Sequence, residues 1–357
     1  MKTPTKKVDP ESIIPQFIPN RVYIEQGALE YPIGKGIKEK FDKEGVPIKI
    51  IKTHQRVTGI PGDTREEGYR EAKRTLVVGV RKSKDFQTCK PSAHYQLPLS
   101  TSCPGLCKYC YLNTTLGKKP YLRVYVNIDD ILAKAKNYID KGAPEETVFE
   151  GAATSDPLPV EGLTGNLRKS IEFFAREDLG RFRFVTKFTN VDSLLDLEHN
   201  KKTRIRFSLN TDRVIKEYEQ GTPGLYQRIE AAGKVYRAGY PIGFIIAPIM
   251  LTPGYRKEYR HLLENLREEL LKSGLDAQSE IPFELITHRF TARAKQNIEE
   301  IFPHHGLPMD ESKRRFKYGQ FGYGKYVYHK EDMEDLQRFF NDEIKKLFPG
   351  GEIVYFV

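Results

Sequence analysis

The chain has 357 residues, 39% of them hydrophobic and 30% charged, and its formal net charge is +10 at pH 7. This length suits one large domain with additions, or two domains. No stretch approaches the roughly 20 apolar residues that a membrane-spanning helix needs, and the N-terminus lacks the apolar segment of a signal peptide. We therefore expect a cytoplasmic protein with no membrane partner. The positive charge fits either a solvated basic surface or a polyanionic partner, nucleic acid first.

Residues 1–92 are expected to form an N-terminal α/β extension. The segment RVYIEQGALEYPIGKGIKEKF, residues 21–41, predicts a short strand, a glycine turn and a helix. Residues 48–57 and 75–82 have the pattern of strands, and a polar link rich in Gly and Pro joins them.

From about residue 95, short apolar runs alternate with amphipathic helical stretches, which indicates βα units and a parallel sheet. The segment IDDILAKAKNYIDKG, residues 128–142, is typical, because its apolar residues share one helical face. Six such units over residues 93–303 predict an open, partial (β/α)6 barrel. The expected strands are residues 95–100, 147–152, 181–188, 203–209, 242–249 and 283–288.

The alternation stops after about residue 302, and residues 304–357 are expected to form a β-hairpin, a helix and a terminal strand. The hairpin segment KRRFKYGQFGYGKYVYHK, residues 313–330, mixes basic, aromatic and glycine residues. Charges of this kind neutralise phosphates and aromatic rings stack on opened bases, but lysines also protect a solvated edge hairpin from aggregation. The candidate DNA-binding residues are Arg314, Arg315, Lys317, Tyr318, Lys325 and Tyr326, with Phe321 and Tyr323 interleaved.

Three of the four cysteines, Cys103, Cys107 and Cys110, form a C-x3-C-x2-C run within TSCPGLCKYCYL, residues 101–112. A structural zinc ion would need a fourth ligand. The candidates are Cys89 and the adjacent histidines His304 and His305, which are distant in the sequence and therefore weak. A disulfide would leave one of the three thiols unpaired. The remaining interpretation is a 4Fe-4S cluster held by three thiolates, with one iron open to a small molecule. The motif follows the first expected barrel strand and therefore lies at the mouth of the barrel.

A C-x3-C-x2-C motif after the first strand of a partial barrel resembles the radical S-adenosylmethionine (SAM) enzymes. Longer segments resemble one family among them, the spore photoproduct lyases, which repair a UV-induced thymine dimer of spore DNA. These segments run from about residue 85 to 328 and are far more specific than the cysteine motif. They are CPGLCKYCYLNTTLGKKPYLRVYVNID, FEGAATSDP, FRFVTKF, IRFSLNT, ITHRFT and KYGQFGYGKYVY.

The resemblance implies the following chemistry. Cys103, Cys107 and Cys110 would ligate the cluster, and SAM would chelate the open iron. An electron from an unknown donor would then cleave SAM to a 5′-deoxyadenosyl radical. That radical would take a hydrogen from the spore photoproduct, 5-thyminyl-5,6-dihydrothymine, in UV-damaged double-stranded DNA. The linking bond would break to leave two thymines, once a protein group returns a hydrogen.

The resemblance also suggests residues that bind SAM. Lys187 would pair with the SAM carboxylate, and Ser208 suits the ribose hydroxyls. Ala247 would pack on the adenine. Tyr111 and Ser155 complete the set, as the residue after the last cysteine and a residue that follows the second strand. The alternative is that such residues are ordinary cap and loop positions.

One position departs from the family pattern. In the FEGA-x-TSD segment the family usually carries a cysteine that donates the hydrogen, and this chain has Ala153. The chain is then an inactive or deliberately altered variant, or the donor has moved. We expect Cys89 to be the donor, with Tyr109 and Tyr111 relaying a hydrogen to its thiyl radical. The alternative is that Cys89 is a small buried hydrophobic residue.

Two other functions stay open at this point. One is a radical SAM enzyme that acts on another substrate, such as an amino acid or an RNA base. It would share the cluster but would have no use for the basic aromatic hairpin. The other is a non-catalytic, metal-stabilised DNA-binding protein.

Overall fold

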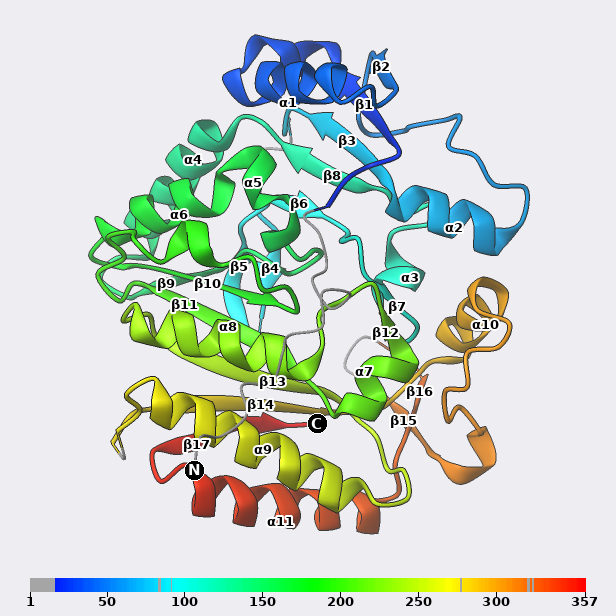
Figure 1. Cartoon of the computed structure of the whole chain (residues 1–357), viewed down its shortest axis with the longest axis vertical. Helices are drawn as coiled ribbons and strands as arrows, with labels where there is room; N and C mark the ends of the chain where they lie inside the picture. The colour runs from blue at the N-terminus through cyan, green and yellow to red at the C-terminus, as the bar shows by residue number, and fades with distance from the viewer. Residues whose placement is uncertain (1–16, 83–84, 91, 277, 320–321, 323) are drawn as a thin grey trace, which may run out of the picture.

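Two β-sheets organise the chain in the computed structural model, which describes residues 17–82, 85–90, 92–276, 278–319, 322 and 324–357 (Figure 1). The larger sheet has eight strands in the order β17-β14-β13-β11-β10-β9-β5-β4, and neighbours are parallel except β4 and β5. Its strands are β4 (Thr88–Cys89), β5 (Ala93–Gln96), β9 (Thr147–Glu150), β10 (Gly180–Thr186), β11 (Thr203–Leu209), β13 (Ile242–Ile249), β14 (Ile281–Thr287) and β17 (Gly351–Phe356).

Strands β5, β9, β10, β11, β13 and β14 correspond to the six expected strands and lie side by side in chain order. The first of them is shorter than expected, because β5 ends at Gln96 and residues 100–101 pair in the smaller sheet instead. The sheet is curled into a half-barrel, so the chain is a mixed α/β protein. The terminal strand β17, expected after the barrel, adds to the free edge of β14. The helices of this part are α4 (Ile128–Gly142), α5 (Glu161–Thr164), α6 (Asn166–Ala175), α7 (Asp212–Tyr218), α8 (Leu225–Arg237), α9 (Tyr255–Lys272), α10 (Ala292–Ile301) and α11 (Lys330–Leu347).

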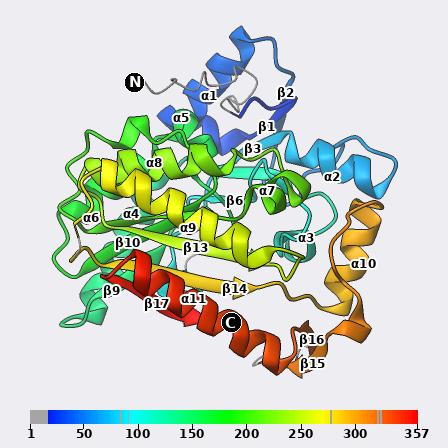
Figure 2. The ribbon, with the colours of Figure 1, turned by 60° about the horizontal axis from the view of Figure 1, so that its bottom comes forward.

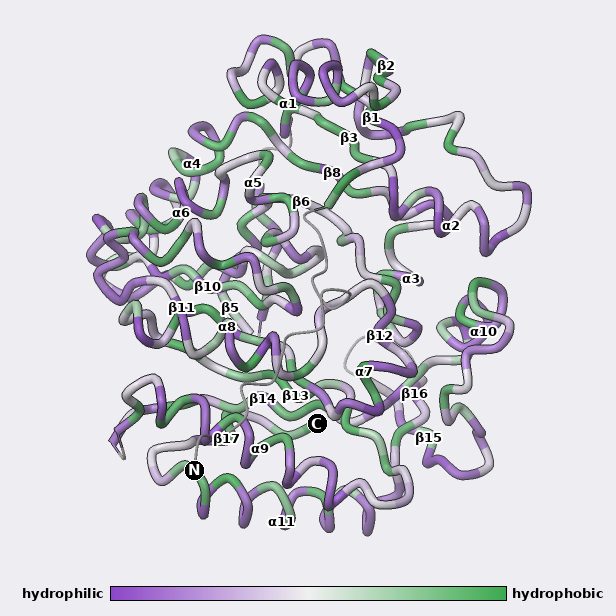
Figure 3. Tube along the Cα trace, viewed as in Figure 1, coloured by the Kyte–Doolittle hydropathy of each residue, from purple (hydrophilic) through white to green (hydrophobic). Residues whose placement is uncertain are grey.

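Hydrophobic burial explains why the helices cover the sheet. Strand β13 is almost wholly buried, and β10 alternates buried with half-buried positions. Figure 3 shows apolar segments along the central strands, whereas α9 and α11 alternate between polar and apolar turns. One continuous core joins the apolar faces of these helices to the strands. No helix in the described ranges is long and apolar enough to cross a membrane.

The smaller sheet has five strands in the order β2-β1-β3-β8-β6. It contains β1 (Arg21–Glu25), β2 (Ile48–Ile51), β3 (Thr75–Gly79), β6 (Ser100–Thr101) and β8 (Leu122–Tyr125), with α1 (Pro32–Lys43) and α2 (Arg65–Lys73) beside it. Strands β6 and β8 come after residue 93, yet they pair with the N-terminal strands. The N-terminal extension therefore shares its sheet with the segment that carries the cysteines.

The segment between residues 57 and 75 was expected to be an irregular polar link, but its second half is helical. Helix α2 occupies its second half and begins with a capping box in which Thr64 and Glu67 satisfy each other's backbone N–H groups. The glycines and prolines that suggested a loop all lie before this cap, except Gly68.

The expected C-terminal hairpin is present as β15 (Arg315–Tyr318) and β16 (Gly324–Val327). Phe321 and Tyr323 lie outside the described residues. Figure 2 shows the hairpin beyond the end of β14, beside α11. Tyr326 and Phe290 exchange two backbone hydrogen bonds, which attach the hairpin to the segment after β14.

Candidate active site

The three cysteines lie in a loop held against the carboxyl end of the half-barrel. Within it, β7 (Leu106–Cys107) pairs with β12 (Glu219–Gln220), and α3 (Leu112–Thr115) follows. The backbone N–H of Ser102 donates to Thr154 O at 2.8 Å, which places the start of the loop beside the end of β9. Cys107 is buried and the other two cysteines are half-buried.

Gly105 leaves a small space that the thiols border. A Cβ atom at this position would lie 3.7 Å from Cys103 Sγ and 3.8 Å from Cys107 Sγ. Burial, together with the nearby Cys110, raises the pKa of Cys103 to about 11, although Lys73 opposes this rise. Burial raises the pKa of Cys107 as well. Thiols this costly to ionise become thiolates only beside a cation, which iron would supply.

The described residues offer no group of three or more His, Cys, Asp or Glu that could hold a single metal ion. In a 4Fe-4S cluster each thiolate binds a different iron, so the sulfurs stand further apart than around one zinc ion. His305 lies beside the loop, but its carbonyl accepts from Lys108 Nζ at 3.1 Å and its ring Nδ1 accepts from Leu307 N at 2.8 Å. The donor set fits a cluster better than a zinc site.

A buried carboxylate, Glu219, ties the cysteine loop to the barrel. Its Oε2 pairs with Arg228 at 2.6 Å and its Oε1 with Lys187 at 2.9 Å. The hydroxyl of Tyr109 also donates to Glu219 Oε1 and accepts from Lys187 Nζ at 3.0 Å. Burial alone would raise the pKa of Glu219, but Arg228 and Lys187 lower it to about 2. We call these four residues the Glu219 network.

The network gathers most of the residues expected to bind SAM. Besides Lys187 itself, Ser208 contributes its carbonyl, which accepts from Arg228 Nη1 at 3.0 Å, and Ala247 O lies 3.5 Å from Tyr109 Oη. Ser155 is set apart, since its buried Oγ has no hydrogen-bond partner among the described residues. That orphaned hydroxyl is free to bind a ligand.

Tyr111 connects the loop to position 153. Its ring is exposed, but its hydroxyl donates to Ala153 O. Burial, then Cys110 and Cys89, raise the pKa of this hydroxyl, so Cys89 lies within electrostatic range. Burial and Glu150 raise the pKa of the Cys89 thiol, which keeps it protonated.

Sequence reasoning missed Glu219 and Arg228. Both come from a stretch that reads as the end of one helix and the start of the next. Their role depends on the pairing of β12 with β7, residues more than one hundred positions apart. The only local signal was a pair of opposite charges nine residues apart, which is too common to be informative.

The hairpin presents three of the six expected DNA-binding residues to solvent. Arg315, Lys317 and Tyr318 are exposed, and Tyr318 retains 73% of its accessible surface. Lys325 and Tyr326 are half-buried. Burial, with the positive charges of Arg289 and Lys317, lowers the pKa of Lys325, as expected in an electropositive patch.

Arg314 differs from this expectation, because the structure buries it. Its guanidinium donates to His288 O at 2.8 Å and to Pro308 O at 2.9 Å, and it lies 3.8 Å from the centre of the Tyr328 ring. In this position Arg314 anchors the base of the hairpin instead of facing a phosphate.

Replacement of Glu219 tests the network. We predict that Glu219→Ala lowers the free energy of unfolding of the metal-free protein by about 3–5 kcal/mol, because the buried Arg228 and the half-buried Lys187 lose their counter-charge. Urea unfolding at neutral pH measures this, and Gln220→Ala, at the exposed neighbour, is the control. The wild type should also lose this contribution as pH falls from about 4.3 towards about 2, since folding depresses the pKa of this carboxyl. A loss below about 1 kcal/mol in the variant contradicts the central role of Glu219.

Comparisons with known proteins identify the family of this chain. The family described as "Spore photoproduct lyase" matches residues 17–357. The chain is 49% identical to the spore photoproduct lyase of Clostridium acetobutylicum, over 94% of this chain and 98% of that protein. It is also 49% identical to that of Bacillus subtilis, over 95% and 98%.

Two solved structures have the same fold at 49% identity, each with a TM-score of 0.92 over 96% of this chain and 100% of theirs. One is a spore photoproduct lyase double mutant with bound AdoMet and dinucleoside spore photoproduct, and the other is a spore photoproduct lyase complexed with the dinucleoside. The chain therefore belongs to the spore photoproduct lyase family of radical SAM DNA repair enzymes.

Proposed function

We propose that this protein is a lyase that reverts the spore photoproduct in UV-damaged double-stranded DNA to two thymines. The observation that carries the proposal is the loop of three cysteines, with the Cys103 and Cys107 thiols beside Gly105, at the carboxyl end of a curled parallel sheet. This is where (β/α) folds place their chemistry. The strand order from β5 to β14 supports the description of the sheet as a partial (β/α)6 barrel.

Cys103, Cys107 and Cys110 would hold a 4Fe-4S cluster, and the remaining iron would take SAM. When both are bound, they supply the 5′-deoxyadenosyl radical that removes a hydrogen from the lesion. Lys187 already gives two of its three N–H donors to Glu219 and Tyr109, so one remains for the SAM carboxylate.

The other SAM contacts follow from position. The unpartnered Ser155 Oγ supplies a further hydrogen bond, and Ser208 at the end of β11 suits the ribose. Ala247 offers a small surface for the adenine, and Tyr111 offers its backbone.

Cys89 is the hydrogen donor in this proposal. Its S–H bond breaks, the hydrogen atom passes to the carbon radical of the product thymine, and a thiyl radical remains on Cys89. Tyr111 would then return a hydrogen atom from its O–H group, and Tyr109, held by Glu219, would replace the hydrogen that Tyr111 loses. 5′-Deoxyadenosine would supply the last hydrogen atom to Tyr109, and the adenosyl radical formed in this way would recombine with methionine to restore SAM and return the electron to the cluster. Ala153 has no transferable hydrogen, and the raised pKa of Cys89 keeps the required S–H bond intact at neutral pH.

The repair assay tests the function. Anaerobically reconstituted protein, given SAM, dithionite and a dinucleoside spore photoproduct, should bind about four irons and release thymidine, as measured by chromatography. Cys107→Ala should lose both the iron and the repair. SAM cleavage without thymidine would favour an enzyme that acts on another substrate. A protein that binds neither iron nor SAM would leave only a DNA-binding role.

Loss of the donor has a distinct signature. We predict that Cys89→Ala retains iron and SAM cleavage but repairs at least about tenfold more slowly, a loss of about 1.4 kcal/mol in transition-state stabilisation. Aborted products, such as sulfinate adducts in dithionite, should accumulate. Adding Ala153→Cys to this variant should restore repair, because a thiol returns to the position that the family usually uses. Unchanged repair by Cys89→Ala contradicts the assignment.

The hairpin should matter only for duplex DNA. We predict that Lys317→Ala weakens binding to lesion-containing duplex and reduces the slope of log affinity against log salt by about 1, since one phosphate contact is lost. Repair of the dinucleoside should not change. Lys330→Ala, at the start of α11, is the matched control. Equal salt slopes for Lys317→Ala and wild type would rule out this contact.

A further inference from the structure

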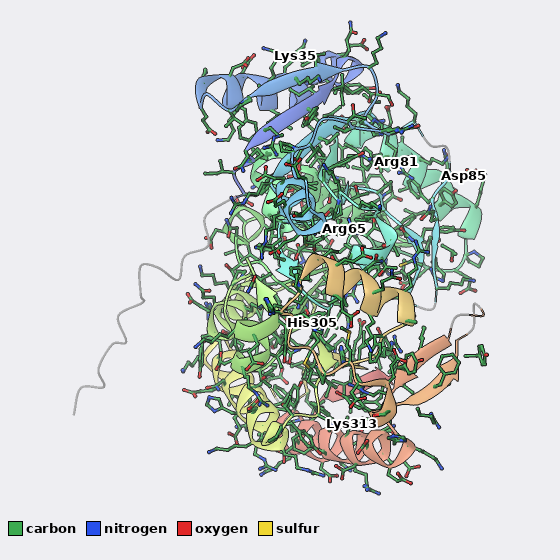
Figure 4. The ribbon with its side chains drawn as sticks, turned by 90° about the vertical axis from the view of Figure 1, so that its right-hand side faces the viewer. Lys35, Arg65, Arg81, Asp85, His305 and Lys313 are labelled. Atoms are coloured by element: carbon green, nitrogen blue, oxygen red, sulfur yellow. The ribbon has the colours of Figure 1, made fainter. Side chains whose placement is uncertain are left out.

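Helix α2 belongs to the N-terminal extension, yet its last turn packs against the cysteine loop. Figure 4 looks onto this side of the molecule, where Arg65 marks the start of α2 above α10. At the other end of the helix, Lys73 retains only 2% of its accessible surface. Its Nζ donates to Cys103 O at 3.0 Å and to Ser102 Oγ at 3.3 Å.

Among the described residues, Lys73 is a buried cation that forms no ion pair with Asp or Glu. Besides its two hydrogen bonds, it contacts the Tyr69 ring, whose centre is 5.4 Å from Nζ. Burying an ammonium group without an opposite charge is costly. A residue placed in this way points to a negative group that binds beside it.

The cysteine thiols lie where that negative charge would arise. Lys73 is the strongest influence that lowers the pKa of Cys103, against the larger effect of burial. On the same helix, the buried Tyr69 hydroxyl donates to Asn113 Oδ1 at 2.6 Å, and Asn113 Nδ2 reaches Cys107 O at 3.4 Å. One face of α2 therefore contacts Cys103 directly and is linked to Cys107 through Asn113.

Lys73 also fixes the backbone where the loop begins. Ser102 has a φ of +65°, a conformation that costs a non-glycine residue energy and needs support from its surroundings. Its Oγ donates to Pro120 O at 2.8 Å and accepts from Lys73, while its N–H is held by Thr154 O. These contacts determine where the adjacent Cys103 points.

We propose that Lys73 is the counter-charge and positioning residue of the iron–sulfur cluster, so that α2 is part of the redox site. This inference rests on the proposed function, because it requires the cluster. Reduction adds one negative charge to the cluster, and a buried cation stabilises the reduced form more than the oxidised form. Lys73 would thus raise the reduction potential, and its loss would make the cluster harder to reduce.

An EPR-monitored redox titration of reconstituted protein tests the inference. At a fixed ambient potential near the wild-type midpoint, we expect the ratio of reduced to oxidised cluster to be about tenfold lower in Lys73→Gln than in wild type, a shift of about 59 mV to more negative values for a one-electron couple. Lys73→Arg keeps the charge and should stay close to wild type. Arg70→Gln removes a half-exposed charge from the same helix, paired with Glu66, and should also leave the potential unchanged.

Each outcome bears on the inference. Equal potentials for Lys73→Gln and wild type would overturn it. If Lys73→Gln binds no iron, Lys73→Arg decides: a loaded Lys73→Arg protein supports the role of the charge, whereas failure of both variants to load overturns it. Wild-type protein that forms no cluster would instead refute the proposed function, and this inference with it.

Discussion

The buried carboxylate of Glu219 is the interaction on which the rest of the site depends. It is neutralised from two directions, by Arg228 of α8 and by Lys187 after β10, and it lies on the short strand that pairs with the cysteine loop. Removing Glu219 leaves the fully buried Arg228 without its counter-charge. The network therefore holds a loop, a helix and the end of a barrel strand in one arrangement, as a preorganised site requires.

Both sheets contribute residues to the candidate active site around Glu219. The half-barrel supplies Ser155, Lys187 and Ser208 at the carboxyl ends of its strands, while α2 of the smaller sheet lies against the other side of the loop. The N-terminal extension is thus more than a cover for the barrel. Its sheet is completed by β6 and β8, which flank the loop in sequence, so the loop leaves and re-enters the same small sheet.

A second buried polar cluster lies inside the half-barrel. Arg206 pairs with Glu150 and with Glu284, the latter at 2.6 Å, and Arg183 pairs with Glu150 at 3.2 Å. Arg183 also donates to Ser92, three residues after Cys89 of β4. Glu150, Arg183 and Arg206 all act on the pKa of the Cys89 thiol, so this charged cluster lies close to the proposed hydrogen donor.

Local patterns predicted the strands and the cysteine motif, because a buried strand and a compact thiol run are visible over a few residues. Helix α2 was missed because the glycines and prolines before it dominated the composition, although the Thr64–Glu67 capping box was a readable signal. Lys73 and Glu219 could not be predicted, since their partners lie far away in the sequence. Arg314 was expected at the surface, but it is buried at the base of the hairpin, where it contacts His288 and Tyr328. The sequence does not show these contacts, because folding alone brings the three residues together.

The most direct measurement is EPR spectroscopy of the anaerobically reduced protein, before and after SAM is added. If three cysteines ligate the proposed cluster and leave one iron to coordinate SAM, the reduced protein will give a 4Fe-4S signal whose g-values shift on addition of SAM. A signal that SAM does not change, or no signal after reconstitution with iron and sulfide, would contradict it.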